Sequence, residues 1–403
     1  MKICYLYIAD YNTQLTGVDL KVKRKFEALK EIFPQSLFVQ FDGNATDINR
    51  DEYNLTIPIN YPNKNYFKRF FNTKKLFNTV NNFISDKKDQ YDFFILRYPL
   101  ASLSLMQLIN KNKNKIIFEH NTNELAELKL TIKKNKKIIP FSCRPSILSY
   151  YISDIYFSYF IEKKLGKKIL KSAAGGICVT PEIEKIEKEK YPTYDTIVIS
   201  NGLNKNFKQA IKNKQNDKIL KGVFIAGTLA VWHGIDRIIR SFVETEKNKT
   251  IELYFVGKID NDILKNYTDL IGVSIFIIDY LNKNELHDLL NEMHFAIGTC
   301  ALHKTELYEG AVLKVREYLS VGLPVVIGYH DPYINSIPEL KKYCLNFKAD
   351  DSLLDFQCID NFIRDLYNQT ENLNTDIQEQ AFKYLSWEHL LKPLPKFLNQ
   401  IKS

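Results

Sequence analysis

The feature that most constrains the fold is a double series of short, β-branched apolar segments separated by longer helical patterns. The first series consists of "ICYLYIA" (3–9), "LFVQF" (37–41), "DFFILR" (92–97), "KIIFEH" (115–120), "GGICVT" (175–180) and "TIVISNG" (196–202). The second consists of "GVFIAG" (222–227), "IELYFVG" (251–257), "VSIFII" (273–278), "HFAIGT" (294–299) and "LPVVIG" (323–328). Continuous apolar strands that alternate with helices are typical of parallel sheets covered on both faces. The sequence therefore predicts an α/β protein with two doubly wound, Rossmann-like domains.

A polar, lysine-rich stretch separates the two series. It reads "NGLNKNFKQAIKNKQNDK" (201–218) and has the composition of a linker. A chain of 403 residues is long enough for two or three domains. We therefore expect the first domain to cover residues 1–202 and the second to begin at residue 203 and end near residue 384.

The net charge indicates which kinds of partner the protein can bind, and the cysteine content indicates the cellular compartment. The formal net charge of +9 suits anionic substrates or an acidic membrane surface. It is also compatible with nucleic acid, but we find no nucleic-acid-reading motif and expect no such partner. The six cysteines are scattered without a C-x-x-C pair, which favours neither a zinc site nor disulfides. Reduced thiols, a start without signal-peptide character and the lack of a membrane-spanning apolar run predict a cytoplasmic protein.

The polar residues that follow the strands are the first candidates for a site, because ligands of open parallel sheets bind beyond the carboxyl ends of the strands. In the first series these positions hold Arg97 and His120. In the second series they hold the loop "GTLAVWHG" (227–234), Lys258 and the loop 298–310. His120 has an alternative explanation in simple turn chemistry, since Asn-Thr follows it.

The stretch "ELYEGAVLKVREYLSVGLPVV" (306–326) carries two glutamates, Glu309 and Glu317, around a run of small residues. It predicts a helix that begins near Gly310, and the first amides of a helix favour a phosphate group. A helix over the whole interval would separate the two glutamates by about 12 Å. Each carboxylate accepts hydrogen bonds from hydroxyl groups, which suits a sugar at one end and a ribose at the other. The stretch therefore predicts either a site for a nucleotide-diphosphate sugar or an ordinary surface helix in which Lys314 and Glu317 pair at i,i+3.

The segment "EGAVLKVREYLSVGLPVV" (309–326) resembles the E-x7-E signature of retaining family-4 glycosyltransferases with the GT-B architecture. Other segments resemble parts of that family in the same order: "TGVDLKVKRKFEAL" (16–29), "FEHNTNELAEL" (118–128), "AAGGICVTPEI" (173–183), "VISNGLN" (198–204), "GVFIAGTLAVWHGIDRIIRSF" (222–242) and "LSWEHLL" (385–391). The resemblance spans nearly the whole chain. It implies two doubly wound domains that face a central cleft, with residues from about 385 to 403 crossing back to the first domain.

The resemblance also implies roles for individual residues. Glu309 would contact the donor sugar and take part in catalysis, while Glu317 would hold the ribose. His120 corresponds to the family's histidine beside the anomeric centre and is the second catalytic candidate. Gly17 corresponds to a glycine in the loop that closes over the phosphates and the acceptor. The amides that would contact the sugar and the diphosphate are those of Gly310, Ala311 and Val312.

One loop departs from the family pattern. Many relatives carry an arginine and a lysine after the first strand of the second domain, where this chain has "GTLAVWHG" (227–234). The donor-binding candidates in this loop are Gly227, Thr228 and His233. His233 has an alternative explanation as a helix-entry residue beside Trp232.

Lys258 and Lys314 are the candidates to replace the missing positive clamp. Members of the family usually act without a metal, so positive protein groups stabilise the leaving diphosphate. Each lysine is alternatively an ordinary solvated side chain, and Lys314 would then pair with Glu317 along the helix. We therefore expect no metal and no cofactor, with a nucleotide-diphosphate sugar as the donor substrate.

The resemblance implies a retaining glycosyltransferase that acts on a glycan, lipid-linked or protein-linked acceptor in cell-surface polysaccharide or glycoconjugate synthesis. The alternative is a catalytically silent relative that serves as a partner or glycan-binding subunit. The sequence names neither the base, the sugar, the acceptor, the linkage nor the oligomeric state.

Two aromatic segments bear on the acceptor. "NKNYFKRFFNTKKLFNTVNNF" (63–83) mixes basic and aromatic residues, which is typical of a helix at the surface of an anionic membrane. An ordinary amphipathic helix with its aromatic face in the core is the alternative. "SYYISDIYFSYFIEKKLGKKI" (149–169) would line an acceptor channel or pack internally. Membrane contact would place the protein at the inner face of the cell membrane.

Overall fold

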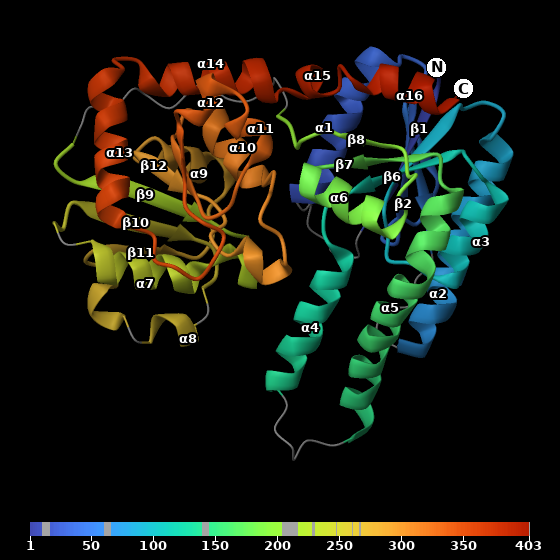
Figure 1. Ribbon diagram of the computed structural model, residues 1–403, viewed down its shortest axis with the longest axis horizontal. Coiled ribbons are helices and arrows are strands. Elements are labelled where there is room, and N and C mark those ends of the chain that lie inside the picture. Colours follow the sequence, from blue (N-terminus) through green and yellow to red (C-terminus); the bar gives the residue numbers. More distant parts are fainter. Residues whose placement is uncertain are drawn as a thin grey trace. The chain divides into compact units, whose positions relative to one another are not determined.

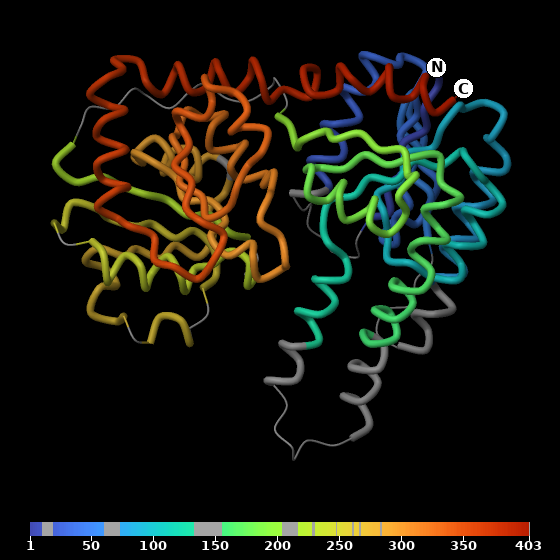
Figure 2. The backbone as a smooth tube through the Cα atoms, in the orientation of Figure 1, coloured from blue at the N-terminus to red at the C-terminus, as the bar shows by residue number. Residues whose placement is uncertain are grey.

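The computed structural model describes residues 1–9, 17–59, 66–138, 145–203, 217–227, 230–246, 248–259, 261–265 and 267–402 (Figures 1 and 2). The chain forms two compact units. One consists of Met1–Ile199 together with Leu391–Ser403, and the other of Ser200–Leu390. Most of the proposed linker, from residue 204 to residue 216, lies outside the described residues. The sequence-based domain limits near residues 202 and 385 stay predictions.

The first unit is built on an eight-stranded sheet with the order β3-β4-β2-β1-β5-β6-β7-β8. Every pair is parallel except β3 with β4. The strands are β1 (Ile3–Ile8), β2 (Leu37–Asp42), β3 (Asn49–Arg50), β4 (Asn54–Pro58), β5 (Phe93–Arg97), β6 (Ile116–His120), β7 (Gly175–Cys178) and β8 (Thr196–Val198). The central strands are buried residue after residue, as in Phe94, Ile95, Ile117 and Phe118. Both faces of the sheet are therefore covered, which explains the continuous apolar runs in the sequence.

Helices cover this sheet and include the last segment of the chain. They are α1 (Gly17–Ile32), α2 (Tyr66–Lys87), α3 (Leu103–Lys111), α4 (Glu124–Ile138), α5 (Pro145–Ser172), α6 (Pro181–Lys190) and α16 (Leu394–Lys402). The C-terminus consequently lies in the same unit as the N-terminus (Figures 1 and 2). Lys402 Nζ lies 2.6 Å from Asp92 Oδ1, and Leu394 and Leu398 are fully buried.

The second unit contains a six-stranded, fully parallel sheet with the order β11-β10-β9-β12-β13-β14. The strands are β9 (Leu220–Ile225), β10 (Ile251–Val256), β11 (Ile275–Ile278), β12 (Phe295–Ile297), β13 (Val325–Ile327) and β14 (Cys344–Asn346). Counted within this unit, the order is the 3-2-1-4-5-6 arrangement of the Rossmann fold. The order therefore reverses between β9 and β12, and a ligand is expected beyond their carboxyl ends.

The second unit has α-helices and short 3-10 helices between its strands. The α-helices are α7 (Ile235–Thr245), α8 (Asn261–Leu264), α9 (Lys283–Leu290), α10 (Leu313–Ser320), α11 (Pro332–Asn335), α12 (Pro338–Lys341), α13 (Phe356–Gln369), α14 (Leu373–Leu385) and α15 (Trp387–Leu390). The 3-10 helices are η1 (Val231–His233), η2 (Thr268–Leu270) and η3 (Leu302–Thr305). Polar caps begin several of them; the Asp355 carboxylate, for example, accepts hydrogen bonds from the Gln357 and Cys358 amides at the start of α13.

The two aromatic segments differ in their burial. In α2, Leu76, Phe77, Val80 and Ile84 belong to the core, which favours the amphipathic alternative for the part whose side chains are described. The first side chains of α2, including those of residues 68 and 69, lie outside that part. In α5, Tyr156, Phe157 and Phe160 are exposed. Across the described residues, no helix combines the length and the apolar character that a membrane crossing requires.

Candidate functional site

The strand order of the second unit reverses between β9 and β12, and open space lies beside Gly227, just beyond the end of β9. This residue follows β9, and a methyl group in place of its hydrogen would meet no described atom within 4 Å. Gly298 follows β12 and is crowded instead, because a methyl group there would lie 2.8 Å from the Val315 side chain. Val315 belongs to α10, so Gly298 allows α10 to pack closely on the end of β12. A ligand can therefore approach the backbone at Gly227 but not at Gly298.

The segment before α10 is extended and not helical. Glu309 forms a parallel β-bridge with His330, and the Gly310 N–H donates to the His330 carbonyl at 3.0 Å. The helix consequently begins at Leu313, with Val312 as its N-cap. The prediction of a helix starting near Gly310, with the Gly310 amide unpaired, is wrong because this long-range backbone pairing takes the amide.

The first turn of α10 nevertheless keeps unpaired donors. Within the described residues, the N–H groups of Ala311, Leu313 and Lys314 donate to no backbone carbonyl, and no side chain caps the helix. The Asn201 side-chain amide donates to the Ala311 carbonyl at 2.6 Å and holds the segment in place. Amides at a helix N-terminus favour an anion through their dipoles. The helix start can therefore bind a phosphate group.

Lys314 places an unpaired ammonium at the same helix start. Its Nζ is buried and has no hydrogen-bond partner in the part of the chain that the structure describes. The Nζ lies 4.3 Å from the centre of the Phe224 ring, at the end of β9. Burial lowers the pKa of Lys314 to about 8. The charge of Glu317 partly opposes this shift, so the alternative in which the two side chains pair along the helix stays open. The ammonium itself makes no hydrogen bond to the described residues and is available to an anion that reaches it.

His233 adds a neutral hydrogen-bond donor beside this lysine. Its Nδ1 accepts a hydrogen bond from the Ala230 amide at 3.3 Å, which places the ring proton on Nε2. Burial and the neighbouring charge of Lys314 lower the pKa of His233 to about 3, so the ring is neutral at physiological pH. Its ring centre lies 5.8 Å from that of Phe224. Phe224 thus contacts both candidate ligand-binding side chains.

A buried ion pair between Arg316 and Asp331 restrains α10. The Arg316 guanidinium donates to both carboxylate oxygens of Asp331, to the Ser200 hydroxyl at 2.9 Å and to the Asn201 carbonyl at 3.2 Å. Tyr318 accepts a hydrogen bond from the Ile225 amide at 2.9 Å, which ties α10 to the end of β9. Together these contacts tie α10 to several other segments and so fix the position of its first turn.

In the first unit, His120 lies at the end of β6 and is fully buried. Its Nε2 lies 3.3 Å from the Tyr194 hydroxyl, and its ring packs on Tyr98 with the ring centres 4.9 Å apart. Its Nδ1 lies 3.7 Å from a carboxylate oxygen of Glu187. Burial and the charge of Lys190 hold the pKa of His120 well below its usual range. The side chain is therefore a neutral part of the interior in this structure.

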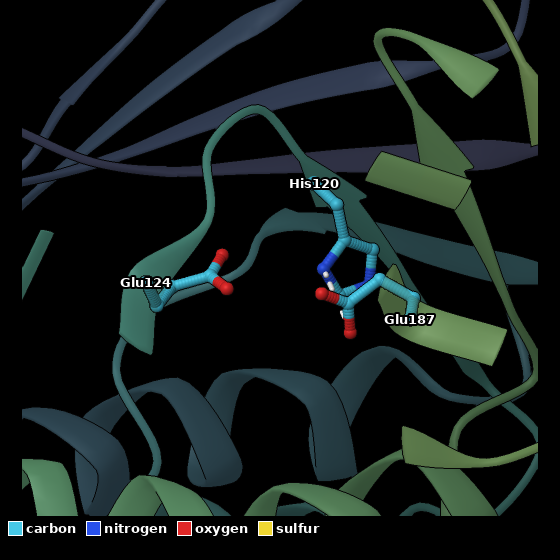
Figure 3. Close-up of side chains that lie close together, drawn as sticks. All are labelled: His120, Glu124 and Glu187. Atoms are coloured by element: carbon cyan, nitrogen blue, oxygen red, sulfur yellow. Dashed lines mark ion pairs between the residues drawn. The ribbon is translucent and has the colours of Figure 1, made fainter. Parts of the chain in front are cut away.

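Three potential metal ligands converge at this histidine. His120, Glu124 at the start of α4 and Glu187 on α6 point toward one another (Figure 3), with their ligand atoms all within 4.8 Å. Lys190 already brings a cation to this group, because its Nζ lies 2.7 Å from Glu187 and 3.3 Å from Glu124. A divalent ion would be repelled by this ammonium. The donor set therefore fits a lysine-neutralised charge cluster better than a metal site.

A second buried charge cluster anchors α1 to β6. The Glu119 carboxylate lies 3.1 Å from Lys25 and 3.4 Å from Lys21 and accepts a hydrogen bond from the Tyr5 hydroxyl. Gly17 is the first residue of α1. The loop that precedes it, residues 10–16, lies outside the described residues.

Solved structures share the fold of this chain over nearly their full length. A glycosyltransferase from Rickettsia africae ESF-5 is 14% identical, with 99% of this chain and 98% of that chain covered and a TM-score of 0.58. WaaG, a glycosyltransferase involved in lipopolysaccharide biosynthesis, is 12% identical, with 98% of each chain covered and a TM-score of 0.55. The lipopolysaccharide outer core galactosyltransferase WaaB is 12% identical, with 99% of each chain covered and a TM-score of 0.60. The fold is GT-B. The predicted fold class is thereby confirmed.

Sequence comparison adds nothing to this likeness of fold. No family description matches the chain, and no curated protein sequence matches it. A GT-B fold by itself does not establish an activity, since function depends on the site that the fold carries.

Within the GT-B fold, the predicted donor-binding residues divide into two groups. Gly227, His233, Lys314 and the Ala311 amide lie near the reversal of strand order in the second unit, whereas the Gly310 amide is paired with His330. Lys258 is exposed after β10, and within the described chain no hydrogen bond or ion pair links it to the others. Thr228 lies outside the described residues.

The two glutamates of the motif flank the start of α10. Glu309 is half-buried and Glu317 is exposed, and both take part in contacts within the protein. The roles predicted for Glu309, Glu317 and His120 stay predictions. A direct contact between His120 and a sugar requires the groups that bury its ring to move.

Sequence reasoning missed several residues that shape this GT-B site. Arg316 stands inside the glutamate motif, yet its burial depends on Asp331, Ser200 and Asn201, which lie outside the motif. Phe224 appeared in the sequence as one more apolar strand residue. A signal for Lys190 was also present, because Glu187 and Lys190 are three residues apart on a predicted helix.

Proposed function

We propose that the protein is a retaining, metal-independent glycosyltransferase that moves a sugar from a nucleotide-diphosphate sugar to a glycan, lipid-linked or protein-linked acceptor. The observation that carries the proposal is the Lys314 ammonium, which is buried without a hydrogen-bond partner among the described residues, at the reversal of strand order in a GT-B fold. An unpaired buried charge is unfavourable, so an anion that reaches it is bound with a gain in free energy. The diphosphate of the donor is that anion.

The groups around Lys314 suit the charge that develops during transfer. When the bond between the anomeric carbon and the diphosphate breaks, negative charge accumulates on the leaving phosphate oxygen. Lys314, the Nε2–H of His233 and the amides at the start of α10 are donors directed at such a charge. They are fixed before the reaction begins, which is the condition under which electrostatic stabilisation is most effective.

The two glutamates would divide the recognition of the donor. In this proposal Glu309 accepts hydrogen bonds from the sugar hydroxyls, and Glu317 accepts them from the ribose. The acceptor oxygen forms its bond to the anomeric carbon on the face from which the diphosphate leaves. The acceptor's proton passes to the departing phosphate, so configuration is retained and no protein nucleophile is required.

The burial of His120 supports a second candidate function. Because this ring is fully enclosed, a protein that binds the donor without transferring the sugar is consistent with the same second unit. Such a silent relative would serve as a partner or glycan-binding subunit. A transfer assay with the cognate donor separates the two candidates.

The test is a binding screen of nucleoside diphosphates and nucleotide sugars by thermal shift, followed by calorimetry. A ligand that binds only the folded protein raises its unfolding temperature. Lys314→Met should weaken the best diphosphate by about 1.5–3 kcal/mol, or roughly 10- to 150-fold. Lys304→Met is the control, because the Lys304 ammonium is already paired with Asp351 at 2.5 Å. The proposal is wrong if no nucleotide stabilises the protein, or if Lys314→Met binds like the wild type.

A further inference from the structure

A cavity of about 270 Å³ lies in the first unit, at the carboxyl ends of β5 and β6 and the first turn of α4. This position matches the place where open parallel sheets bind ligands. Its volume is just below the usual range for drug-sized ligands, so it suits one small ring. Its lining includes Arg97, Leu100, Glu119, Glu124, Glu127 and Leu128.

Two of the acidic groups in this cavity do not need a charge from a ligand. Glu119 is paired with lysines, at 3.4 Å from Lys21 and 3.1 Å from Lys25. Glu124 shares Lys190 with Glu187, and burial raises the pKa of Glu124 to about 8, so this carboxyl is largely protonated near pH 7. Neither carboxylate therefore needs a cation from a ligand.

The remaining two charged groups are Arg97 and Glu127, and they have opposite signs. Both are half-buried. Burial raises the pKa of Glu127, and the charge of the nearby Arg97 opposes this rise. Across the described residues, neither charged group makes a side-chain hydrogen bond or a salt bridge. The Arg97 guanidinium can therefore donate hydrogen bonds to a ligand, and the Glu127 carboxylate can accept them. The opposite charges of the two groups offset each other.

A neutral ligand with several hydroxyl groups fits these properties better than an ion. An anion would gain from Arg97 and lose against Glu127, and a cation would do the reverse. A hydroxyl group both donates and accepts, so it can bind the guanidinium and the carboxylate at once. The apolar side chains of Leu100 and Leu128 offer a surface for the carbon–hydrogen face of a ring.

We infer that this cavity binds one neutral sugar ring, held between Arg97 and Glu127. On the proposed function, this ring belongs to the acceptor, so the acceptor is a glycan recognised through an uncharged sugar residue. Recognition through a lipid phosphate would leave Glu127 facing an anion.

The test uses saturation-transfer NMR with three neutral probes: methyl β-D-glucopyranoside, methyl β-D-galactopyranoside and methyl N-acetyl-β-D-glucosaminide. Inorganic phosphate and ethanolamine are the charged probes. At least one glycoside should bind the full-length protein more tightly than either charged probe. Arg97→Gln and Glu127→Gln should each weaken that glycoside by about tenfold or more. The control Glu189→Gln, an exposed residue on α6, should bind it like the wild type.

A cavity-filling variant covers the case in which the charge variants fold poorly. Leu128→Trp fills the cavity without changing its charge and should abolish glycoside binding. The inference is overturned if no glycoside binds, if a charged probe binds more tightly, or if the variants bind like the wild type. Nucleoside diphosphate binding, which reports on the second unit, separates this failure from failure of the proposed function. All these variants should retain it.

Discussion

At the scale of single residues, the protonation of Lys314 links the site to pH. Burial lowers its pKa in the folded protein to about 8, whereas an unfolded chain has a lysine pKa of about 10.4. Between these values the unfolded chain holds a proton that the folded protein has released. The free energy of unfolding of the ligand-free protein should therefore rise with pH across this interval.

Denaturant unfolding at about pH 7.5 and about pH 9.5 measures this effect. The rise should be smaller in Lys314→Met, which has no ammonium to deprotonate. Nucleoside diphosphate affinity should fall over the same interval in the wild type, since the ligand prefers the charged lysine. Lys304→Met should keep both dependences, and an identical pH response in Lys314→Met would contradict the prediction.

Substitution of Glu309 and of Glu317 should affect different measurements: loss of Glu317 should lower the affinity for the diphosphate, and loss of Glu309 should lower the transfer activity. Glu317→Ala should weaken a bare nucleoside diphosphate by about 1.5–3 kcal/mol, because a charged acceptor for the ribose is lost. Glu309→Ala should bind the diphosphate nearly normally and lose transfer activity, because its proposed contact requires the sugar. Calorimetry and a transfer assay measure the two quantities. Equal loss of diphosphate affinity in both variants would show that the proposed placement of the donor is wrong.

At the scale of elements, the extended segment before α10 depends on a glycine. A methyl group at Gly310 would lie 2.9 Å from Leu302 and 3.0 Å from Tyr329, both of which are buried. The side chains around the segment must therefore shift to accept it. This segment carries Glu309 on one side and the start of the helix on the other.

Gly310→Ala and Gly227→Ala should have opposite consequences. Gly310→Ala should cost about 1–3 kcal/mol of folding stability through overpacking. Gly227→Ala should change stability by less than about 0.5 kcal/mol, because its methyl group meets no described atom within 4 Å. It should nevertheless weaken nucleotide binding, since that open space is where the ligand is proposed to lie. Urea unfolding and calorimetry of both variants provide the test, and a stable Gly310→Ala with normal binding would refute the argument.

The elements that sequence could predict are those with a local apolar signal. All eleven expected strands are present, because each is an apolar run long enough to be recognised. β3, β4 and β14 escaped detection, since β3 has only two residues, "NLTIP" is polar at its start and "CLN" has only three residues. The start of α10 was misplaced because the pairing of Gly310 with His330 joins segments twenty residues apart.

The site was predictable in its residue types but not in its contacts. The motif alone indicates Lys314 as a candidate, whereas the packing of its ammonium depends on Phe224, which is ninety residues away in the sequence. The position at the end of a strand indicates His120. Its enclosure depends on Tyr98, Tyr194 and Glu187, which come from three other segments. Such long-range packing leaves no periodic signal in the sequence.

At the scale of the whole molecule, the last helix completes the unit in which the chain begins. Leu394, Phe397 and Leu398 of α16 are buried, and Phe397 lies against Gly175 of β7. Each such side chain contributes about 1.5–3 kcal/mol through burial. Together they amount to a large share of the roughly 5–15 kcal/mol that stabilises a typical protein.

Removal of residues 393–403 should therefore unfold the first unit and leave the second one folded. Limited proteolysis should cut the truncated protein within residues 1–199, while calorimetry should still detect nucleoside diphosphate binding. Lys402→Ala is the control, because its ion pair with Asp92 is partly exposed and surface pairs contribute about 0–1 kcal/mol. Equal protease resistance of the truncated and full-length proteins would show that α16 is dispensable.

The return of the chain to its first unit reverses the usual order of folding during synthesis. Domains generally fold as they emerge, the N-terminal one first. Here residues 200–390 form one uninterrupted unit, while the first unit also needs residues 391–403. A ribosome needs about 10–40 s to add the intervening unit at typical rates. During that time the sheet begun by β1 lacks α16 and exposes the apolar surface that α16 later covers. The unit begun first on the ribosome is therefore the last one to be finished.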